Sequence, residues 1–303
     1  MEPLEVIIRS DVDLSGHLRL PAADGRRPAV VLTGPLSGVK EQVVGRYADE
    51  LAHRGLVTLA FDHRNFGASG GSPRQHEDPG GKLADLRDAT SLLAAHERVD
   101  PERILCVGVC LGGGYALRHA AADPRIAAVA AVGACFNDPR GFQDGMGIDG
   151  YRGTLASLTD LATREYVSGQ LETMPAVSPD GGEAAMPGEE PWAYYGTERS
   201  HSPGWQNLLT RRSLHALLTF DAAGAADLLG ATPLLLVHGR RDDYCAPDGA
   251  EAVAARHGGD VEVVWLDATE HIDLYDVDRF VAAASDAVAA FAARVPGRAV
   301  PMA

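Results

Sequence analysis

Short apolar runs alternate with longer amphipathic segments through the first half of the chain. Apolar runs of roughly four to eight residues are typical of strands buried on both faces, whereas apolar residues spaced three or four apart indicate helices. Strand and helix repeated in this way predict a parallel sheet covered by helices, with an active site at the carboxyl ends of the strands. The expected strands span 29–33, 57–61, 104–109 and 126–134, and the expected helices span 41–53, 82–96 and 111–122.

The two ends of the chain extend this pattern. Near the N-terminus, the strand-like segments 6–9 and 17–20 flank a turn-like segment, which predicts an antiparallel hairpin. Toward the C-terminus the alternation of strand and helix returns, and an amphipathic helix closes the chain. The elements expected there are strands at 233–237 and 261–266 and helices at 248–256 and 277–294.

Between these two halves the alternation stops. Helical spacing is present at 155–171 and at 206–218, but 175–192 carries repeated Pro and Gly and is expected to be a loop. An excursion of this length between two strands of a compact domain is usually functional. The sequence therefore predicts an α/β core of residues 1–136 and 232–303, into which residues 137–231 are inserted as a helical cap over the active site.

Four aromatic residues of the expected cap are candidates for a substrate pocket. They are Trp192, Tyr194, Tyr195 and Trp205. Large aromatic side chains also dominate the packing of cores, so contact between cap and core is the favoured role for most of them.

The segment Gly108-Val109-Cys110-Leu111-Gly112 links an expected strand to an expected helix. This is the setting of a nucleophile elbow, a sharp turn that holds one reactive side chain between small residues. Cys110 is expected at a helix N-terminus, where free backbone amides and the helix dipole lower the pKa of a thiol. An ordinary glycine-rich turn with a buried thiol has the same pattern, so the assignment depends on partners elsewhere in the chain.

Two later loops supply the base and the acid that such a nucleophile needs. One expected strand ends at Val237 and leads to Asp242, and the last expected strand ends at Leu266 and leads to His271. Both loops follow strand ends, and the chain order of nucleophile, acid and histidine is that of the α/β-hydrolases. We therefore expect Cys110, Asp242 and His271 to form a catalytic triad.

Other carboxylates lie close to these positions. Asp243 is the alternative acid, but Asp242 is favoured because it follows the strand end more closely. Glu270 and Asp273, on either side of His271, are expected to be surface or helix-capping groups.

Two backbone amides are expected to form an oxyanion hole. The amide of Leu111 follows the nucleophile directly. The second donor is expected from the loop after strand 29–33, where the amide of Leu36 is favoured because Pro35 has no N–H.

The net charge, the cysteines and the lengths of the apolar runs limit which partners and which cellular location we expect. A formal net charge of −15 over 303 residues opposes binding to nucleic acids or anionic membranes, which is driven by basic charge. The four cysteines lack C-x-x-C spacing and predict neither a disulfide framework nor a zinc site, and no cofactor or metal is expected. The N-terminus has no basic leader with an apolar stretch, and no run approaches the roughly 18 apolar residues of a membrane span, so a cytoplasmic location is expected.

Several blocks along nearly the whole chain resemble the cysteine-containing branch of the α/β-hydrolase superfamily, which includes dienelactone-hydrolase-like proteins and fungal polyketide transferases. The resemblance implies an α/β-hydrolase fold with a mostly parallel eight-stranded sheet and a helical cap, a Cys110–Asp242–His271 triad, and acyl chemistry on an ester, lactone or thioester. The blocks are GVKEQ at 38–42, FDHRNFGAS at 61–69, GVC at 108–110 with GGYA at 113–116, and HIDLYD at 271–276.

One position departs from that resemblance. Many relatives carry a histidine before the proline of the oxyanion loop, whereas this chain has Gly34, which leaves the donor geometry of the loop open. The block around His63 and Arg64 is expected to support the elbow structurally, and His63 is not expected to act directly on substrate.

Residues and resemblance together predict a hydrolase that acts on an ester, lactone or thioester through an acyl-cysteine intermediate. One alternative is an acyltransferase that moves an acyl or polyketide chain from a carrier thioester to an alcohol or amine, because a cap that excludes water favours transfer. A second alternative is a ligand-binding homologue without turnover. The expected partner is a small-molecule acyl substrate, including a coenzyme-A or carrier-protein thioester, and a homodimer is left open.

Overall fold

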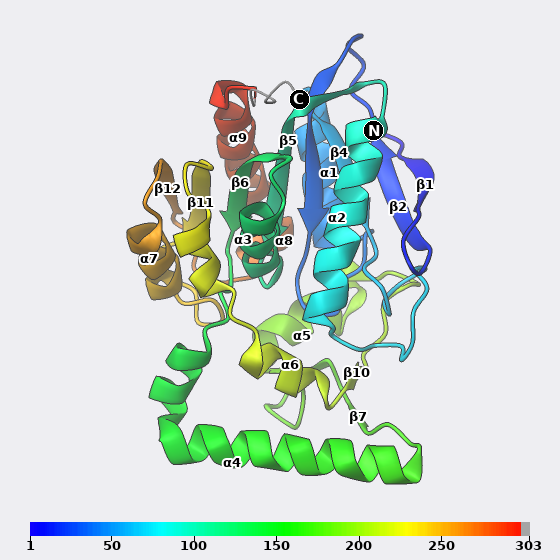
Figure 1. Cartoon of the computed structure of the whole chain (residues 1–303), viewed down its shortest axis with the longest axis vertical. Coiled ribbons are helices and arrows are strands. Elements are labelled where there is room, and N and C mark those ends of the chain that lie inside the picture. The colour runs from blue at the N-terminus through cyan, green and yellow to red at the C-terminus, as the bar shows by residue number, and fades with distance from the viewer. Residues whose placement is uncertain (298–303) are drawn as a thin grey trace.

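The apolar runs pair into one eight-stranded sheet in the computed structural model, which describes residues 1–297 (Figure 1). The strand order is β1-β2-β4-β3-β5-β6-β11-β12. The six strands from β4 to β12 are parallel, and β1 and β2 form the predicted antiparallel hairpin at one edge. The strands are β1 (Leu4–Ile8), β2 (Leu14–Arg19), β3 (Arg27–Thr33), β4 (Val57–Phe61), β5 (Val99–Val109), β6 (Ile126–Val132), β11 (Leu234–Gly239) and β12 (Val261–Leu266).

Helices cover both faces of this sheet, as the alternation predicted. α2 and α3 pack side by side on one face, and α1 and α9 pack together on the other (Figure 1). Tyr47, Ala48 and Leu51 of α1 are fully buried. Leu51 follows the other two by four and three residues, and this spacing places all three on the face that meets the sheet. The helices of the core are α1 (Val43–His53), α2 (Pro79–Ala95), α3 (Gly112–Ala122), α7 (Pro247–Arg256), α8 (Asp273–Asp276) and α9 (Asp278–Arg294).

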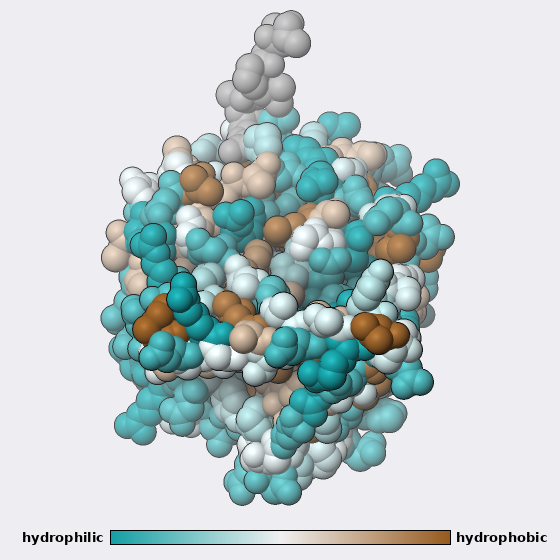
Figure 2. All heavy atoms as spheres, turned by 60° about the horizontal axis from the view of Figure 1, so that its bottom comes forward, coloured by the Kyte–Doolittle hydropathy of each residue, from teal (hydrophilic) through white to brown (hydrophobic). Residues whose placement is uncertain are grey.

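The segment between β6 and β11 lies beyond the carboxyl ends of the strands (Figure 1). Its longest helix, α4, lies on the side of the segment that faces away from the sheet, and Figure 2 shows this side of the molecule. Within the described residues, no helix is both long and apolar enough to cross a membrane. The elements of the segment are α4 (Pro139–Ser168), β7 (Thr173–Met174), β8 (Val177–Ser178), β9 (Met186–Pro187), α5 (Glu189–Tyr195), η1 (Glu198–Ser200), β10 (Leu209–Thr210), α6 (Ser213–Thr219) and η2 (Ala223–Leu228).

The sequence prediction was wrong in extent at several places in this segment. α4 begins at Pro139, well before 155, because the Asp138 side chain caps it by accepting from the Arg140 amide at 2.9 Å. Glycine is unfavourable in helices, so the glycines in the first part of α4 gave no indication of a helix in the sequence. Segment 175–192 contains β8, β9 and the start of α5. Segment 206–218 is helical only from Ser213 onward, where α6 begins.

Two glycines set how closely β3, β5 and α3 approach one another. A Cβ on Gly108 would overlap the carbonyl oxygen of Gly112, and a Cβ on Gly112 would overlap the carbonyl oxygen of Thr33. Backbone atoms at these sites have no free space to move into, because protein interiors are close-packed. The turn between β5 and α3 therefore requires glycine at both positions.

We expect Gly112→Ala to lower the free energy of unfolding by about 2–3 kcal/mol, because the added methyl group forces β3 and α3 apart. Gly249→Ala is the matched control, since a Cβ there meets no atom within 4 Å and the residue lies in α7. Alanine at that position should stabilise the protein by up to about 1 kcal/mol. Urea denaturation measures both changes, and equal effects of the two substitutions would contradict the close approach.

Candidate active site

Cys110 occupies the turn between β5 and α3. Its backbone φ of 55° lies in the left-handed region, which residues other than glycine rarely adopt. The Cys110 amide donates to the carbonyl of Val132 at 3.1 Å, and the Cys110 carbonyl accepts from the amide of Cys135 at 2.9 Å. The end of β6 thus holds the strained turn in place, as a nucleophile elbow requires.

Asp242 and His271 lie together at the same edge of the sheet. One carboxylate oxygen of Asp242 accepts from His271 Nδ1 at 2.7 Å. The other accepts from the backbone amides of Tyr244 at 2.9 Å and Cys245 at 2.7 Å, which orient the carboxylate. Asp243 is exposed. The structure therefore brings together the three residues expected as a triad, and Asp242 is the carboxylate that contacts the histidine.

Two further side chains, which the sequence reasoning missed, complete this cluster. Cys245 Sγ lies 4.0 Å from Cys110 Sγ and 3.9 Å from His271 Nε2. The Tyr275 hydroxyl lies 3.0 Å from the same nitrogen of His271. Cys245 follows Asp242 by three residues and Tyr275 follows His271 by four, so nearness to the expected triad was the available signal.

The surroundings favour a thiolate on Cys110 and a proton on His271. Hydrogen bonding with Cys245 lowers the pKa of Cys110, and the charge of His271 lowers it further, so that the pKa lies well below the usual range despite burial. Burial lowers the pKa of His271, but the Cys110 thiolate and Asp242 outweigh it and raise the pKa to about 10. Contact with Cys110 raises the pKa of Cys245 well above its usual value, so this thiol keeps its proton and donates it.

A cavity of about 280 Å³ adjoins Cys110, and its walls are mainly apolar. Two residues that line it carry buried polar atoms with no hydrogen-bond partner among the described residues: the hydroxyl of Tyr195 and the side-chain oxygen of Asn137. Leaving such an atom unsatisfied costs roughly 1–3 kcal/mol, so these atoms indicate places for polar groups of a ligand. Other lining residues include Leu36, Leu111, Phe142, Met186, Pro191 and Leu217.

Of the four aromatic residues singled out in the sequence, only Tyr195 lines the cavity. Its ring stacks on Trp205, with the ring centroids 5.5 Å apart. Tyr194 is buried and packs edge to face against Tyr275. Trp192 is partly buried against the core. Packing is thus the observed role of most of these residues.

The two residues whose amides are expected as oxyanion donors lie at the same cavity as Cys110. Leu36 and Leu111 both line the cavity beside Cys110. Neither backbone amide donates to another residue within 1–297, so both are available to a ligand. Leu111 is the N-cap of α3, where the first amides of a helix have no partner within the helix.

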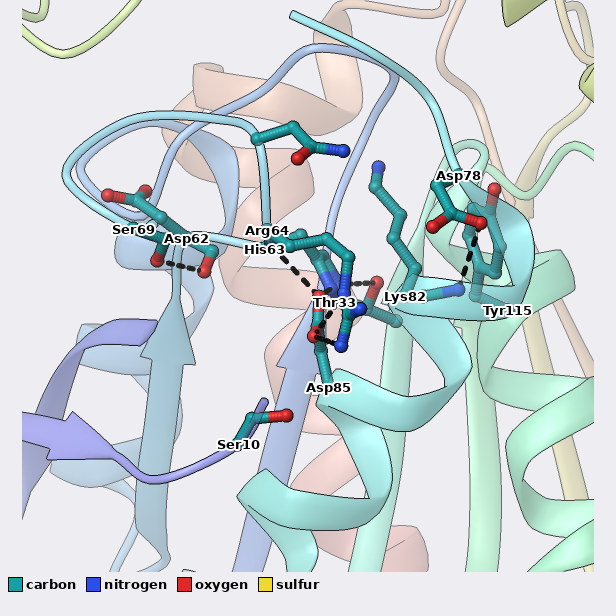
Figure 3. A network of polar contacts seen from close by, with 12 residues as sticks. Ser10, Thr33, Asp62, His63, Arg64, Ser69, Asp78, Lys82, Asp85 and Tyr115 are labelled. Atoms are coloured by element: carbon teal, nitrogen blue, oxygen red, sulfur yellow. Dashed lines mark hydrogen bonds and ion pairs between the residues drawn. The ribbon is translucent and has the colours of Figure 1, made fainter. Parts of the chain in front are cut away.

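A buried polar network supports the expected oxyanion loop from the side of α2 (Figure 3). His63 Nε2 lies 3.0 Å from the hydroxyl of Thr33, the last residue of β3, and His63 Nδ1 lies 3.2 Å from Asp85. The same carboxylate accepts from the Arg64 guanidinium at 2.8 Å. Burial lowers the pKa of His63, so the neutral ring donates to Asp85 and accepts from Thr33. His63 therefore contacts the end of β3, where the expected oxyanion loop begins, and it is absent from the cavity wall.

The ligand atoms of Cys110, Cys245 and His271 lie within 4.8 Å of one another. Thiols and imidazole are the groups that bind zinc in proteins, so these three side chains have the chemistry to hold such an ion. Two of them are also the expected nucleophile and base.

The sheet order, the strained elbow and the Asp–His pair after the last strands define an α/β-hydrolase. Over residues 29–278 the chain matches the family described as Serine aminopeptidase, S33, and it belongs to that family. This chain carries cysteine at the elbow, although the family is described by a serine enzyme.

Three relatives extend this comparison. The solved structure of the hypothetical protein PA2218 from Pseudomonas aeruginosa is similar over 97% of this chain and 94% of its own, with a TM-score of 0.84 and 29% identity. The polyketide transferase ATR5 of Stachybotrys chlorohalonatus is 30% identical over 74% of each chain. The thiohydrolase aneE of Aspergillus aculeatus is 35% identical over 43% of this chain and 40% of its own. Family and relatives together define an enzyme of hydrolase or acyltransferase type.

We expect iodoacetamide to alkylate Cys110 at a rate that changes little between about pH 8 and pH 6, because a thiol with a depressed pKa remains a thiolate as the pH falls. An ordinary thiol, with a pKa near 8.5, loses about tenfold in rate for each pH unit below that value. Cys106 is the internal control, since burial in β5 raises its pKa and shields it. Peptide mapping by mass spectrometry measures both rates, and a tenfold fall per unit at Cys110 would contradict the assignment.

Proposed function

We propose that this protein hydrolyses an ester, lactone or thioester through an acyl intermediate on Cys110. The observation that carries the proposal is the contact of His271 with Asp242 at 2.7 Å, beside a buried cysteine whose pKa is held low. A thiolate is the reactive form of cysteine toward acyl carbon, and a protonated imidazole beside it is ready to assist the leaving group.

In the first step, the Cys110 thiolate attacks the carbonyl carbon and a C–S bond forms. The electron pair of the carbonyl moves onto its oxygen, where the amides of Leu36 and Leu111 stabilise the negative charge. His271 gives the proton on Nε2 to the departing alcohol or thiol as the bond to the leaving group breaks. Asp242 holds the imidazole ring in the orientation that this transfer needs.

In the second step, water attacks the acyl-cysteine and His271 accepts its proton. The C–S bond breaks, Cys110 leaves as a thiolate and the carboxylic acid is released. One water molecule is consumed for each ester or thioester, and the proton on His271 is restored. The mainly apolar wall of the cavity favours a hydrocarbon-rich acyl group.

Acyl transfer is the second candidate function. It differs from hydrolysis only in the second nucleophile, because an alcohol or amine takes the place of water. The support for it is the match to a polyketide transferase over 74% of the chain, together with the cavity wall that residues between β6 and β11 provide. Product analysis with alcohol and amine acceptors present separates the two functions, since transfer yields a new ester or amide.

We expect Cys110→Ala to abolish the acyl-enzyme that forms with p-nitrophenyl esters or an acyl-coenzyme A, because it removes the thiol that the elbow holds beside His271 and the amides of Leu36 and Leu111. Cys135→Ala is the matched control: it removes another thiol of the cavity wall and should retain acylation. Intact-protein mass spectrometry detects the adduct. Adducts of equal yield in both variants would refute the nucleophile, and a wild-type protein that binds ligands without acylation would favour the non-catalytic alternative.

Tyr195 is a candidate third donor to the oxyanion. A Cβ on Gly38 would lie 3.6 Å from the Tyr195 hydroxyl, so this hydroxyl lies against the oxyanion loop, and it has no partner among the described residues. Burial raises the pKa of the phenol well above its usual value, so the hydroxyl stays protonated and able to donate. Such a donor would offset the presence of Gly34 in the loop.

We expect Tyr195→Phe to lower kcat by about tenfold to a hundredfold with little change in KM, because a donor to the oxyanion acts mainly in the transition state. Tyr194→Phe removes the neighbouring buried hydroxyl, which does not line the cavity, and should change kcat by less than about threefold. Steady-state kinetics of both variants measures the effect. A rise in KM alone would show that Tyr195 only helps to bind substrate.

A further inference from the structure

The outer face of α4 is unusually exposed for a helix of 30 residues. Only Leu158, Leu161 and Glu165 are buried, and they hold the helix against the rest of the molecule. The side chain of Ile148 is 48% exposed near one end, and those of Tyr166 and Val167 are 90% and 80% exposed near the other. Figure 2 shows hydrophobic side chains toward both ends of this face and hydrophilic ones between them.

Charged and small residues share the exposed face between these ends. Gly147 breaks the helical backbone with a φ of 72°, and the helix is continuous from 148 to 168, a length of about 30 Å. Spacings of three and four residues align one row opposite Leu158 and Leu161. The row consists of Asp149, Arg152, Gly153, Ala156, Asp160, Thr163, Arg164 and Val167, all of which are exposed.

On either side of Ala156, charged residues of this row lie at nearly equal distances along the helix and carry opposite charges. Arg152 precedes Ala156 by four residues and Asp160 follows it by four. Asp149 precedes Ala156 by seven and Arg164 follows it by eight. A two-fold axis beside Ala156 would therefore place each positive side chain of one helix opposite a negative one of an antiparallel copy, and Ile148 near Tyr166 and Val167 of that copy.

Most of these charged side chains form no ion pair within the part of the chain that the structure describes. Arg152, Asp160 and Asp149 form no ion pair with any other residue in 1–297, whereas Arg164 pairs with Glu172 at 3.3 Å in an exposed contact. Exposed pairs of this kind contribute about 0–1 kcal/mol and exchange readily. The small side chains of Gly153 and Ala156 allow a second helix to approach closely at the axis.

We propose that α4 pairs with α4 of a second copy of this chain in an antiparallel, two-fold symmetric dimer. The four charges of the row sum to zero, whereas the chain as a whole carries −15. A row with equal numbers of positive and negative side chains is complementary to an antiparallel copy of itself, so the arrangement favours a second copy over other partners. One helix pair buries less than the roughly 800 Å² per partner of a standard interface, so the dimer should dissociate in the micromolar range. This proposal does not depend on the acyl chemistry of the active site.

Sedimentation velocity of the full chain over about 1–200 µM tests the dimer. Arg152→Asp and Asp160→Arg should each weaken it at least tenfold, because each places like charges opposite one another twice. The double variant Arg152→Asp/Asp160→Arg should restore it. Asp24→Arg, in an exposed loop far from α4 in the chain, is the control for net charge and should leave the dimer intact.

The double variant also separates this proposal from a role of the charges within one helix. Arg152→Asp/Asp160→Arg places like charges beside Asp149 and Arg164 on the same helix, so pairing within the helix would worsen while pairing across the axis recovers. Circular dichroism confirms that each variant remains folded. A wild-type chain that is monomeric at about 200 µM, a dimer that neither single variant weakens, or a double variant that stays monomeric would each overturn the proposal.

Discussion

A charged pair held inside an apolar pocket is the interaction on which the proposed chemistry depends. Burial alone would drive Cys110 and His271 to their neutral forms, because moving charges out of water is costly. Here each charge has compensating partners: the Cys245 thiol beside the sulfur, and the Asp242 carboxylate beside the imidazole. Asp242 is fixed in turn by two backbone amides, so the compensation is built into the backbone of the loop after β11.

The position of Cys110 depends on a second constraint, the crowding of backbone at the elbow. Glycine at 108 and 112 lets β3, β5 and α3 meet without side chains between them, and Cys110 is then left in a backbone conformation that is strained for its residue type. The network of His63, Asp85 and Arg64 supports the end of β3 from the side of α2 (Figure 3). The sheet, the elbow and the loop after β3 are thus packed together, and the segment between β6 and β11 lies beyond the carboxyl ends of the strands.

Much of this arrangement could be predicted from sequence because it follows from strand ends. Buried parallel strands produce plain apolar runs, and β4 and β12 match their predicted bounds. Asp242 and His271 come directly after two such runs, so topology alone places them beside Cys110. Cys245 and Tyr275 could not be found in this way, since their contacts depend on the path of a loop and on the one-turn helix α8. The start of α4 was missed because a side-chain cap, and not apolar spacing, determines it.

Cysteine at the elbow also bears on the choice between hydrolysis and transfer. A thioester intermediate resembles the thioesters of acyl carriers in reactivity, so capture of an acyl group from such a donor is close to balanced in free energy. In the proposed mechanism, the fate of the acyl group depends on which nucleophile reaches Cys110 under the segment between β6 and β11. Of the proteins that the chain resembles, one is named a thiohydrolase and another a polyketide transferase.

The protonation state of His271 is the most direct test of the central claim, because a thiolate and an imidazolium must coexist in the resting site. Titration of the histidine ring signals by NMR, with His271 assigned by comparison with His271→Gln, measures it. We predict that His271 stays protonated up to about pH 10 and that Cys110→Ser, which removes the thiolate, lowers this pKa by more than one unit. A His271 ring that is neutral at pH 8 in the unmodified protein, or a pKa that Cys110→Ser leaves unchanged, would contradict the proposed ion pair.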